Sequence, residues 1–334
     1  MDHSGPVCVL GLGLIGGSLL RDLVAAGTSA FGWNRSTATV DAAIADGFDV
    51  SGDLVATLRR AEKEDALIVL GVPVPALPTM LSAVAEHAPS CGITDVTSVK
   101  GEVLSLVEDH GLSDRFVGGH PMAGTADSGW DATMEGLFRG AVWVVTTDGA
   151  PELPDETVDA TWLRIWCRVV HLAVGVGAAV VPARSAAHDG AVARISHLTH
   201  VLAESLAVTA DRGGALSLSL AASSFRDATR VAGTEPGLVR AMCENNRDAL
   251  VTALDETISL LQQARADLAA PDRDIAGLVD AGHAARLRYE ALAGRVAGEP
   301  SARPYIRLQP GVSGWLEQLH YAESVGAQIA LLEV

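Results

Sequence analysis

The amino-acid sequence predicts an α/β protein in which a doubly wound parallel sheet is followed by an all-helical domain. Three observations predict this fold. Short apolar runs alternate with helical segments through the first half of the chain, a glycine-rich turn separates the first run from the first helix, and helical periodicity dominates from residue 185 onward. Strands that alternate with helices form parallel sheets covered by helices on both faces. The length of 334 residues also favours two domains over one.

The first half of the chain contains the predicted strands. Each is a short apolar run bounded by glycine or polar residues, and the runs cover residues 7–12, 29–33, 66–72, 92–96, 116–118 and 141–146. A helix over residues 157–171 then leads out of this region. We therefore expect a first domain over residues 1–180.

The second half of the chain reads as helices and a short tail. Helical patterns cover residues 187–210, 217–230, 237–269 and 274–297, which predicts a helical domain over residues 181–298. Residues 299–334 have a β-α-β-like pattern, with strands at 305–308 and 328–334 around a helix at 314–324. This extension is either an incomplete regulatory module or an addition to the edge of a sheet. The apolar run 169–182 is shorter than the ~20 residues of a membrane span, so we interpret it as core.

The composition excludes several classes of partner. The net charge of −17 opposes binding to nucleic acid and to anionic membranes, because such binding depends on Lys and Arg that neutralise phosphates. The cysteines have neither a CxxC pair nor zinc-type spacing, so we expect them to be reduced, buried and inert. They are Cys8, Cys91, Cys167 and Cys243. The first residues lack the pattern of a signal peptide, which predicts a cytoplasmic protein.

The turn after the first apolar run has the spacing of a dinucleotide-binding motif. Gly11, Gly13 and Gly16 form GxGxxG between a predicted strand and a predicted helix. The first glycine permits the tight turn, the second the close approach of a pyrophosphate, and the third the packing of the helix on the strand. The helix N-terminus offers N–H groups to the phosphates. We therefore expect a Rossmann-type dinucleotide-binding domain, whose further cofactor-binding residues are Leu14, Ile15, Val72 and Pro73.

The end of the second predicted strand indicates which nicotinamide cofactor is bound. A carboxylate at this place accepts a hydrogen bond from the ribose 2′-hydroxyl of NAD. This sequence has Asn34 there instead, followed by Arg35 and Ser36. A guanidinium and hydroxyl groups suit a 2′-phosphate. The sequence therefore favours NADP over NAD; the alternative is that Arg35 is solvated surface and NAD binds.

Two polar segments follow predicted strands at the edge where open α/β sheets bind ligands. Ser98 lies after the fourth strand, and His120 lies in a glycine-flanked turn after the next strand. A histidine can act as a general base near neutral pH. Taken alone, His120 would more often be a structural or surface residue. Its pairing with Ser98 behind a dinucleotide fold predicts a catalytic site.

The helical domain contributes two further polar clusters. His197 and His200 lie three residues apart on one helical face, which indicates either a hydrogen-bonding face toward a polar substrate or a solvated helix face. No third ligand is apparent, so we expect no metal. Asp227 and Arg230 form the second cluster. They are either an ordinary charged helix surface or a substrate site, with Arg230 as the anchor of a carboxylate and Asp227 as its orienting partner or a gate.

Five motifs, in order along the chain to about residue 295, resemble the prephenate/arogenate dehydrogenase family. They are GLGLIGGSL at 11–19, DVTSVKG at 95–101, GGHPMAGT at 118–125, SHLTH at 196–200 and FRDATR at 225–230. The resemblance implies oxidative decarboxylation of a cyclohexadienyl acid with hydride transfer to NAD(P), on the route to tyrosine. It implies that His120 deprotonates the ring hydroxyl and that Ser98 orients this hydroxyl and the imidazole. It also implies a homodimer formed through the helical domain, and a substrate site lined by Thr125, Ser196, His197, His200 and Arg230.

The sequence departs from the family pattern at three places around the substrate. The acid that often follows the threonine of the histidine motif is replaced by Ala126, with Asp127 next. A glycine pair is replaced by Ser223 and Ser224, and a tryptophan by Val239. These changes bear on the choice between prephenate, with a keto side chain, and arogenate, whose ammonium group would need an acceptor or an anion. We favour prephenate and keep arogenate as the alternative.

Two other functions are compatible with this fold. A β-hydroxyacid dehydrogenase also combines a dinucleotide domain with a helical one. The pattern of that class has a catalytic lysine in the first interdomain helix, and neither Lys63 nor Lys100 lies there. A regulatory protein that binds the nucleotide without catalysis would have lost the catalytic residues. Ser98, His120 and Arg230 are all present, which favours the dehydrogenase.

Overall fold

The computed structural model of the chain describes residues 5–125, 127–151, 157–271, 273–293 and 303–332. The chain divides into two compact units, which are described separately. Unit 1 comprises the residues up to His188 together with the tail from Tyr305, and unit 2 comprises Asp189–Pro304. The division falls inside helix α7 (Ser185–Val192). The domain limit expected at residues 298 and 299 lies outside the described residues.

Unit 1 contains a six-stranded parallel sheet with the order β3-β2-β1-β4-β5-β6. Its strands are β1 (Val7–Leu10), β2 (Ala30–Trp33), β3 (Val50–Ser51), β4 (Leu67–Leu70), β5 (Ile93–Asp95) and β6 (Phe116–Val117). The strand order reverses beside β1, and ligands of open α/β sheets bind beyond the carboxyl ends of the strands at this switch point. The predicted Rossmann-type sheet is confirmed. The two-residue strand β3 is too short to give a periodic signal and was not predicted.

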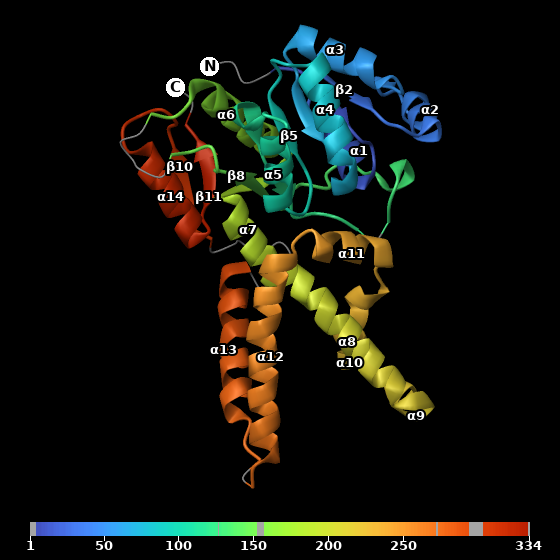
Figure 1. Cartoon of the computed structure of the whole chain (residues 1–334), viewed down its shortest axis with the longest axis vertical. Coiled ribbons are helices and arrows are strands. Elements are labelled where there is room, and N and C mark those ends of the chain that lie inside the picture. Colours follow the sequence, from blue (N-terminus) through green and yellow to red (C-terminus); the bar gives the residue numbers. More distant parts are fainter. Residues whose placement is uncertain (1–4, 126, 152–156, 272, 294–302, 333–334) are drawn as a thin grey trace. The chain divides into compact units, whose positions relative to one another are not determined.

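Both faces of this sheet are buried, which explains the continuous apolar runs of its strands. Cys8 and Leu10 of β1 pack on one face and Val7 and Val9 on the other, because successive side chains of a strand point to opposite faces. Helices α3 (Leu54–Glu64), α4 (Leu77–His87) and α5 (Gly101–Asp109) cover the first face. Helices α1 (Leu14–Ala25), α2 (Thr37–Ala45) and α6 (Ala160–Gly175) contribute to the core on the second face (Figure 1).

A second sheet of unit 1 was not predicted as a separate sheet. It has five strands in the order β10-β11-β9-β8-β7 and mixes parallel with antiparallel pairs. The strands are β7 (Gly119–Pro121), β8 (Val142–Thr146), β9 (Ala179–Ala183), β10 (Tyr305–Leu308) and β11 (Gln328–Leu331), with α14 (Trp315–Val325) between the last two. The tail therefore extends the edge of this sheet (Figure 1). The end of the apolar run 169–182 is strand β9, because it pairs with β8 and β11.

Every regular element among the described residues of unit 2 is a helix, which confirms the predicted helical domain. After α7 the chain forms a π-helical turn η4 (Ala193–His197), α8 (Leu198–Arg212), α9 (Gly214–Ser219), α10 (Ser223–Thr229), η5 (Arg230–Gly233), α11 (Pro236–Glu244), α12 (Arg247–Ala269) and α13 (Ala276–Ala293). The predicted helix 237–269 is two helices, since Asn245 ends α11 and Asn246 starts α12. The side chain of Asn245 donates a hydrogen bond to the carbonyl of Ala241 at 2.6 Å, and Asn is frequent at helix ends because its side chain competes for backbone hydrogen bonds.

Short 3-10 turns η1 (Val74–Ala76), η2 (Ser113–Arg115) and η3 (Trp130–Ala132) complete the elements of unit 1. In the described part of the chain, the helices fall short of the length and apolar character required to cross a bilayer.

All four cysteines are free thiols. Cys8, Cys91 and Cys167 are buried as predicted, whereas Cys243 is half-buried, so that part of the prediction is wrong. Burial raises the pKa of Cys167 to about 11 and that of Cys91 to about 12. A protonated thiol is a poor nucleophile, so these two side chains are unreactive near neutral pH.

Candidate active site

The glycine-rich turn between β1 and α1 has the geometry that a pyrophosphate requires. Gly11 has a φ of +102°, and a Cβ there would lie 2.5 Å from the carbonyl oxygen of Gly71. A Cβ at Gly16 would lie 2.0 Å from the carbonyl oxygen of Gly11, so both positions need glycine. A Cβ at Gly13, in contrast, would meet nothing within 4 Å. Gly13 caps α1 without a side-chain hydrogen bond, and this open N-terminus fits the phosphates of a dinucleotide.

The other residues predicted to contact the cofactor near this turn differ in their burial and in their contact with the turn. Leu14 and Ile15 open α1 and are half-buried. The side chain of Val72 lies 2.8 Å from where a Cβ of Gly11 would be, and Pro73 is exposed. The structure thus places Val72 against the turn.

The end of β2 has no carboxylate. The side-chain oxygen of Asn34 accepts a hydrogen bond from the N–H of Arg35 at 2.9 Å. Ser36 caps α2, since its Oγ accepts a hydrogen bond from the N–H of Thr39 at 3.3 Å. The side chain of Arg35 is exposed, and no carboxylate of the described residues forms an ion pair with it. The strand end therefore presents a cation, an amide and a hydroxyl.

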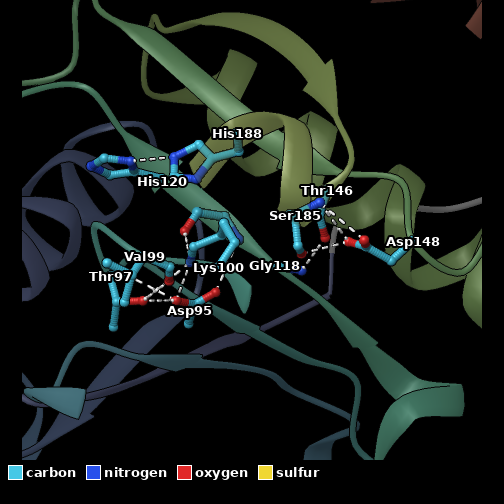
Figure 2. Close-up of polar contacts among 11 residues, drawn as sticks. Asp95, Thr97, Val99, Lys100, Gly118, His120, Thr146, Asp148, Ser185 and His188 are labelled. Atoms are coloured by element: carbon cyan, nitrogen blue, oxygen red, sulfur yellow. Dashed lines mark hydrogen bonds and ion pairs between the residues drawn. The ribbon is translucent and has the colours of Figure 1, made fainter. Parts of the chain in front are cut away.

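A buried ion pair joins the turn that carries Ser98 to the strand that carries His120. Lys100 is 1% exposed and Asp95 0%, and the Nζ of Lys100 donates a hydrogen bond to the Asp95 carboxylate. The N–H of Gly119 donates to Asp95 at 3.0 Å, and Lys100 donates to the carbonyl of Gly119 at 2.7 Å. Both polar groups of the Gly119 backbone are thus bound by the pair. Figure 2 shows this network below His120, the next residue of β7.

Thr97 shapes the turn around Ser98. Its N–H donates to Asp95 at 3.0 Å, and its Oγ1 lies 2.5 Å from the Asp95 carboxylate and 2.9 Å from the carbonyl oxygen of Val99. Ser98 lies in the middle of this turn and is half-buried. The Asp95 carboxylate thus binds the backbone before Ser98, and the Thr97 hydroxyl contacts the backbone after it.

His120 forms a side-chain contact with a second histidine. Its Nδ1 lies 2.8 Å from the Nε2 of His188, which is in α7 and only 3% exposed. The two rings are arranged edge to face with centroids 5.0 Å apart. His120 is half-buried, and its backbone pairs with Val144 of β8. Figure 2 shows the Nδ1 side of His120 turned toward His188.

In unit 2, the predicted residues Ser196 and His197 lie in the π-helical turn η4. Such widened turns are frequent at functional sites. His197 is 1% exposed, and its Nδ1 lies 3.0 Å from the Nδ2 of Asn246, which also donates to the carbonyl of Asp189 at 2.9 Å. A carbonyl only accepts, so the amide orientation of Asn246 is set and His197 accepts at Nδ1. The proton of neutral His197 is therefore on Nε2.

The remaining predicted residues of unit 2 are less constrained. His200 in α8 is half-buried, and its Nδ1 is buried with no hydrogen-bond partner among the described residues. Asp227 in α10 and Arg230 at the start of η5 are both exposed. Across the described ranges these two residues form no ion pair with each other. Ser196 Oγ lies 3.7 Å from the Sδ of Met242.

The places where the sequence departs from the family pattern lie in both units. In unit 1, Thr125 is exposed and its Oγ1 accepts a hydrogen bond from the N–H of Asp127 at 3.2 Å. Ala126 lies outside the described residues. In unit 2, the two serines that begin α10 are exposed, and Val239 in α11 is half-buried.

Four residues that hold these side chains were missed by sequence reasoning. His188 and Asn246 form hydrogen bonds with the predicted residues His120 and His197. Asp95 and Lys100 bind the backbone of Gly119, the residue before His120. For Asp95 and Lys100 a sequence signal existed, since an acid ends a buried strand and one of only two lysines follows five residues later. His188 is 68 positions from His120, so no local spacing connects them.

Two family models match the chain over most of its length. Residues 21–177 match the model described as prephenate dehydrogenase, nucleotide-binding domain. Residues 184–281 match the model described as prephenate dehydrogenase, dimerization domain. The junction between the two matches lies close to the division between unit 1 and unit 2.

Individual relatives carry related names. The chain is 32% identical to a prephenate dehydrogenase of Bacillus subtilis over 270 residues, which are 78% of this chain and 69% of the relative. It is 56% identical to a candidate prephenate dehydrogenase from Corynebacterium glutamicum, whose crystal structure covers 99% of this chain and 100% of its own with a TM-score of 0.94. The crystal structure of Synechocystis arogenate dehydrogenase is 30% identical, covers 85% of this chain and 99% of its own, and has a TM-score of 0.71. The chain belongs to the prephenate dehydrogenase family and is an NAD(P)-dependent dehydrogenase.

Proposed function

We propose that the protein oxidatively decarboxylates prephenate to 4-hydroxyphenylpyruvate, the reaction that leads to tyrosine. The observation that carries this proposal is the placement of His120: it follows the dinucleotide fold, its Nδ1 is bonded, and the backbone of the preceding Gly119 is bound by Asp95 and Lys100 on either side of Ser98. Turnover of prephenate and of arogenate with each cofactor tests the proposal.

The chemistry of the catalytic pair follows from these contacts. The two nitrogens of an imidazole point in diverging directions, so a ring bonded at Nδ1 does its proton transfer at Nε2. His120 Nε2 takes the proton of the substrate's ring hydroxyl, and Ser98 orients that hydroxyl. The turn from Gly11 to Gly16 would hold the dinucleotide, whose nicotinamide would supply the acceptor for the hydride on the carbon that bears the hydroxyl. The ring carboxylate then leaves as carbon dioxide, the electron pair of the broken bond completes the aromatic ring, and the phenolate oxygen takes the proton back from His120 Nε2. Release of carbon dioxide and aromatisation make the reaction effectively irreversible.

Arogenate is the second candidate substrate. The 30% identity to the Synechocystis enzyme supports it, and Asp127 or the serines that begin α10 are acceptors for its ammonium group. The relatives from Bacillus and Corynebacterium support prephenate. We favour prephenate, because a keto side chain does not need a buried anion to neutralise it.

Arg230 binds a carboxylate of the substrate in this proposal. The other proposed substrate-binding residues are Thr125, Ser196, His197, His200 and Asp227. We expect Arg230→Gln to raise the KM for prephenate about 10-fold or more with a smaller change in kcat, because it removes a charge-assisted hydrogen bond common to ground and transition states. Steady-state kinetics measure this. Arg226→Gln is the matched control, since Arg226 is also exposed and lies four residues earlier, in the adjoining helix α10. A loss confined to kcat would contradict the role.

For the cofactor we propose a preference for NADP, with Asn34, Arg35 and Ser36 around the 2′-phosphate. Asn34→Asp keeps the side-chain oxygen that caps the N–H of Arg35 but adds a negative charge. We expect the ratio of kcat/KM for NAD over NADP to rise about 10-fold, or ~1.4 kcal/mol. Arg35→Ala should lower kcat/KM for NADP and leave that for NAD unchanged. An unaltered ratio in Asn34→Asp would mean that other residues read the adenosine end.

We also propose a homodimer formed through unit 2. The family model that matches residues 184–281 is a dimerization domain. Helices α8, α12 and α13 carry large exposed apolar side chains that a dimer interface would shield from water. They include Leu202, Leu206, Leu260, Leu261, Leu268, Val279, Leu287 and Leu292. The mass of the particle in solution, by light scattering, distinguishes a dimer from a monomer.

A further inference from the structure

The contact between His120 and His188 fixes more than the position of a ring. The Nδ1 of His120 and the Nε2 of His188 are 2.8 Å apart, which is the distance of a good hydrogen bond. Such a bond needs one nitrogen with a proton and one without. Two neutral imidazoles therefore pair in one of two ways, and the two ways differ in which nitrogen of His120 carries its proton.

Only one of these arrangements suits a base at Nε2. If His188 donates, the proton of neutral His120 is on Nε2, and that nitrogen has no lone pair with which to take a proton. If His188 accepts at Nε2, the proton of His120 is on Nδ1 and its Nε2 carries the lone pair. The acceptor arrangement also stabilises His120 after it has gained a proton, because the bond then starts from a cationic donor.

His188 is held in place by contacts that do not involve His120. It lies three residues after Ser185, the first residue of α7. The N–H and the Oγ of Ser185 donate to the carboxylate of Asp148 at 3.0 and 2.7 Å, and the N–H of Arg184 donates to Glu323 at 2.8 Å. The start of α7 is thus fixed by two carboxylates.

The strand of His120 is held by the same region. The Oγ1 of Thr146, the last residue of β8, accepts a hydrogen bond from the N–H of Gly118 at 2.8 Å. Asp148 follows β8 by two residues. Residues at the end of β8 therefore bind the chain near both histidines: Thr146 binds Gly118, near His120, and Asp148 binds Ser185, near His188 (Figure 2). Because the backbone is held by hydrogen bonds near His120 and near His188, the two rings are positioned next to each other by the fold.

We infer that His188 is a positioning residue for His120: its Nε2 accepts a hydrogen bond from Nδ1–H and so keeps Nε2 of His120 as the base. This role rests on the proposed function of His120 in proton transfer. His188 does not touch the reacting atoms in this account and acts only through the neighbouring ring. The same partner arrangement orients the catalytic histidine of serine proteases, where a carboxylate takes the place of the second imidazole.

Two substitutions separate this role from simple packing. His188→Leu fills the space but removes the acceptor, whereas Gln can place its carbonyl oxygen where the Nε2 of histidine lies. We expect His188→Leu to lower kcat roughly 10- to 100-fold, the usual scale for a lost partner of a functional imidazole, with KM and cofactor affinity within about twofold. His188→Gln should recover most of this loss.

His171→Leu is the matched control. His171 in α6 bonds a carbonyl of its own helix at 2.7 Å, and its replacement should leave kcat unchanged.

The protonated nitrogen of His120 can be measured without any activity. Histidine-selective ¹⁵N NMR of the whole protein without substrate, with His120 assigned by comparison with His120→Asn, distinguishes Nδ1–H from Nε2–H. We expect Nδ1–H in the wild type and in His188→Gln, and a shift toward Nε2–H in His188→Leu. An Nε2–H proton in the wild type, or the same tautomer and kcat in His188→Leu, would overturn the inference. Full activity of His120→Asn would instead overturn the proposed function, whatever the tautomer.

Discussion

His120→Asn is expected to lower kcat by roughly 100-fold or more, the usual scale for removal of a general base. Asparagine places its amide near the former Nδ1, so the contact with His188 is kept while the group at Nε2 is lost. The affinity for the cofactor should not change, because the turn from Gly11 to Gly16 belongs to a different strand and helix. Steady-state kinetics and cofactor titration by fluorescence measure the two quantities.

The control for this substitution is His110→Asn. His110 lies at the end of α5 and bonds a carbonyl of its own helix at 2.6 Å, so its replacement should leave kcat unchanged. Equal turnover by His120→Asn and the wild type would remove His120 from the mechanism.

Lys100→Met is expected to produce the largest loss of stability. Lys100 and Asp95 are almost completely buried, and removal of one partner leaves a charge in the interior without compensation. Such changes cost about 3–5 kcal/mol of the free energy of unfolding. Denaturation by urea, followed by tryptophan fluorescence, measures the shift of the midpoint. Lys63→Met is a matched control because Lys63 is exposed, and it should change the free energy by less than about 0.5 kcal/mol.

The pairing itself is tested by a double substitution. Asp95→Asn together with Lys100→Met removes both charges, so its cost should be smaller than the sum of the two single costs by about 1–3 kcal/mol. Additive costs, or a Lys100→Met protein as stable as Lys63→Met, would show that the pair does not hold the turn of Ser98 to β7.

The sequence alone predicted the elements that repeat a simple pattern. The strands of the first sheet are buried on both faces, so they appear as short apolar runs, and GxGxxG marks the turn because Gly11 and Gly16 have no room for a side chain. His120 and Ser98 were identified because they follow strands of this sheet. These features depend on local spacing, which a single sequence displays.

The second sheet and the positioning residues depend on contacts between distant parts of the chain. Strand β9 lies at the end of an apolar run, and only its pairing with β8 and β11 makes it a strand. Lys100 would ordinarily be taken as a surface residue, since lysine is almost never fully buried unless it is paired. The pairing of His188 with His120 requires the start of α7 to be placed beside β7, which no local periodicity indicates.

The proposed reaction is tested by the initial rate of reduced-cofactor formation, measured by absorbance with prephenate and arogenate each offered with NAD and NADP. His120→Asn under the same conditions serves as the reference for loss of the base. We expect turnover that is fastest with prephenate and NADP and that falls roughly 100-fold or more in His120→Asn. Faster turnover of arogenate would show that arogenate is the substrate, with His120 and Ser98 still as the catalytic pair. No turnover with any of the four pairings would contradict the assignment of this site.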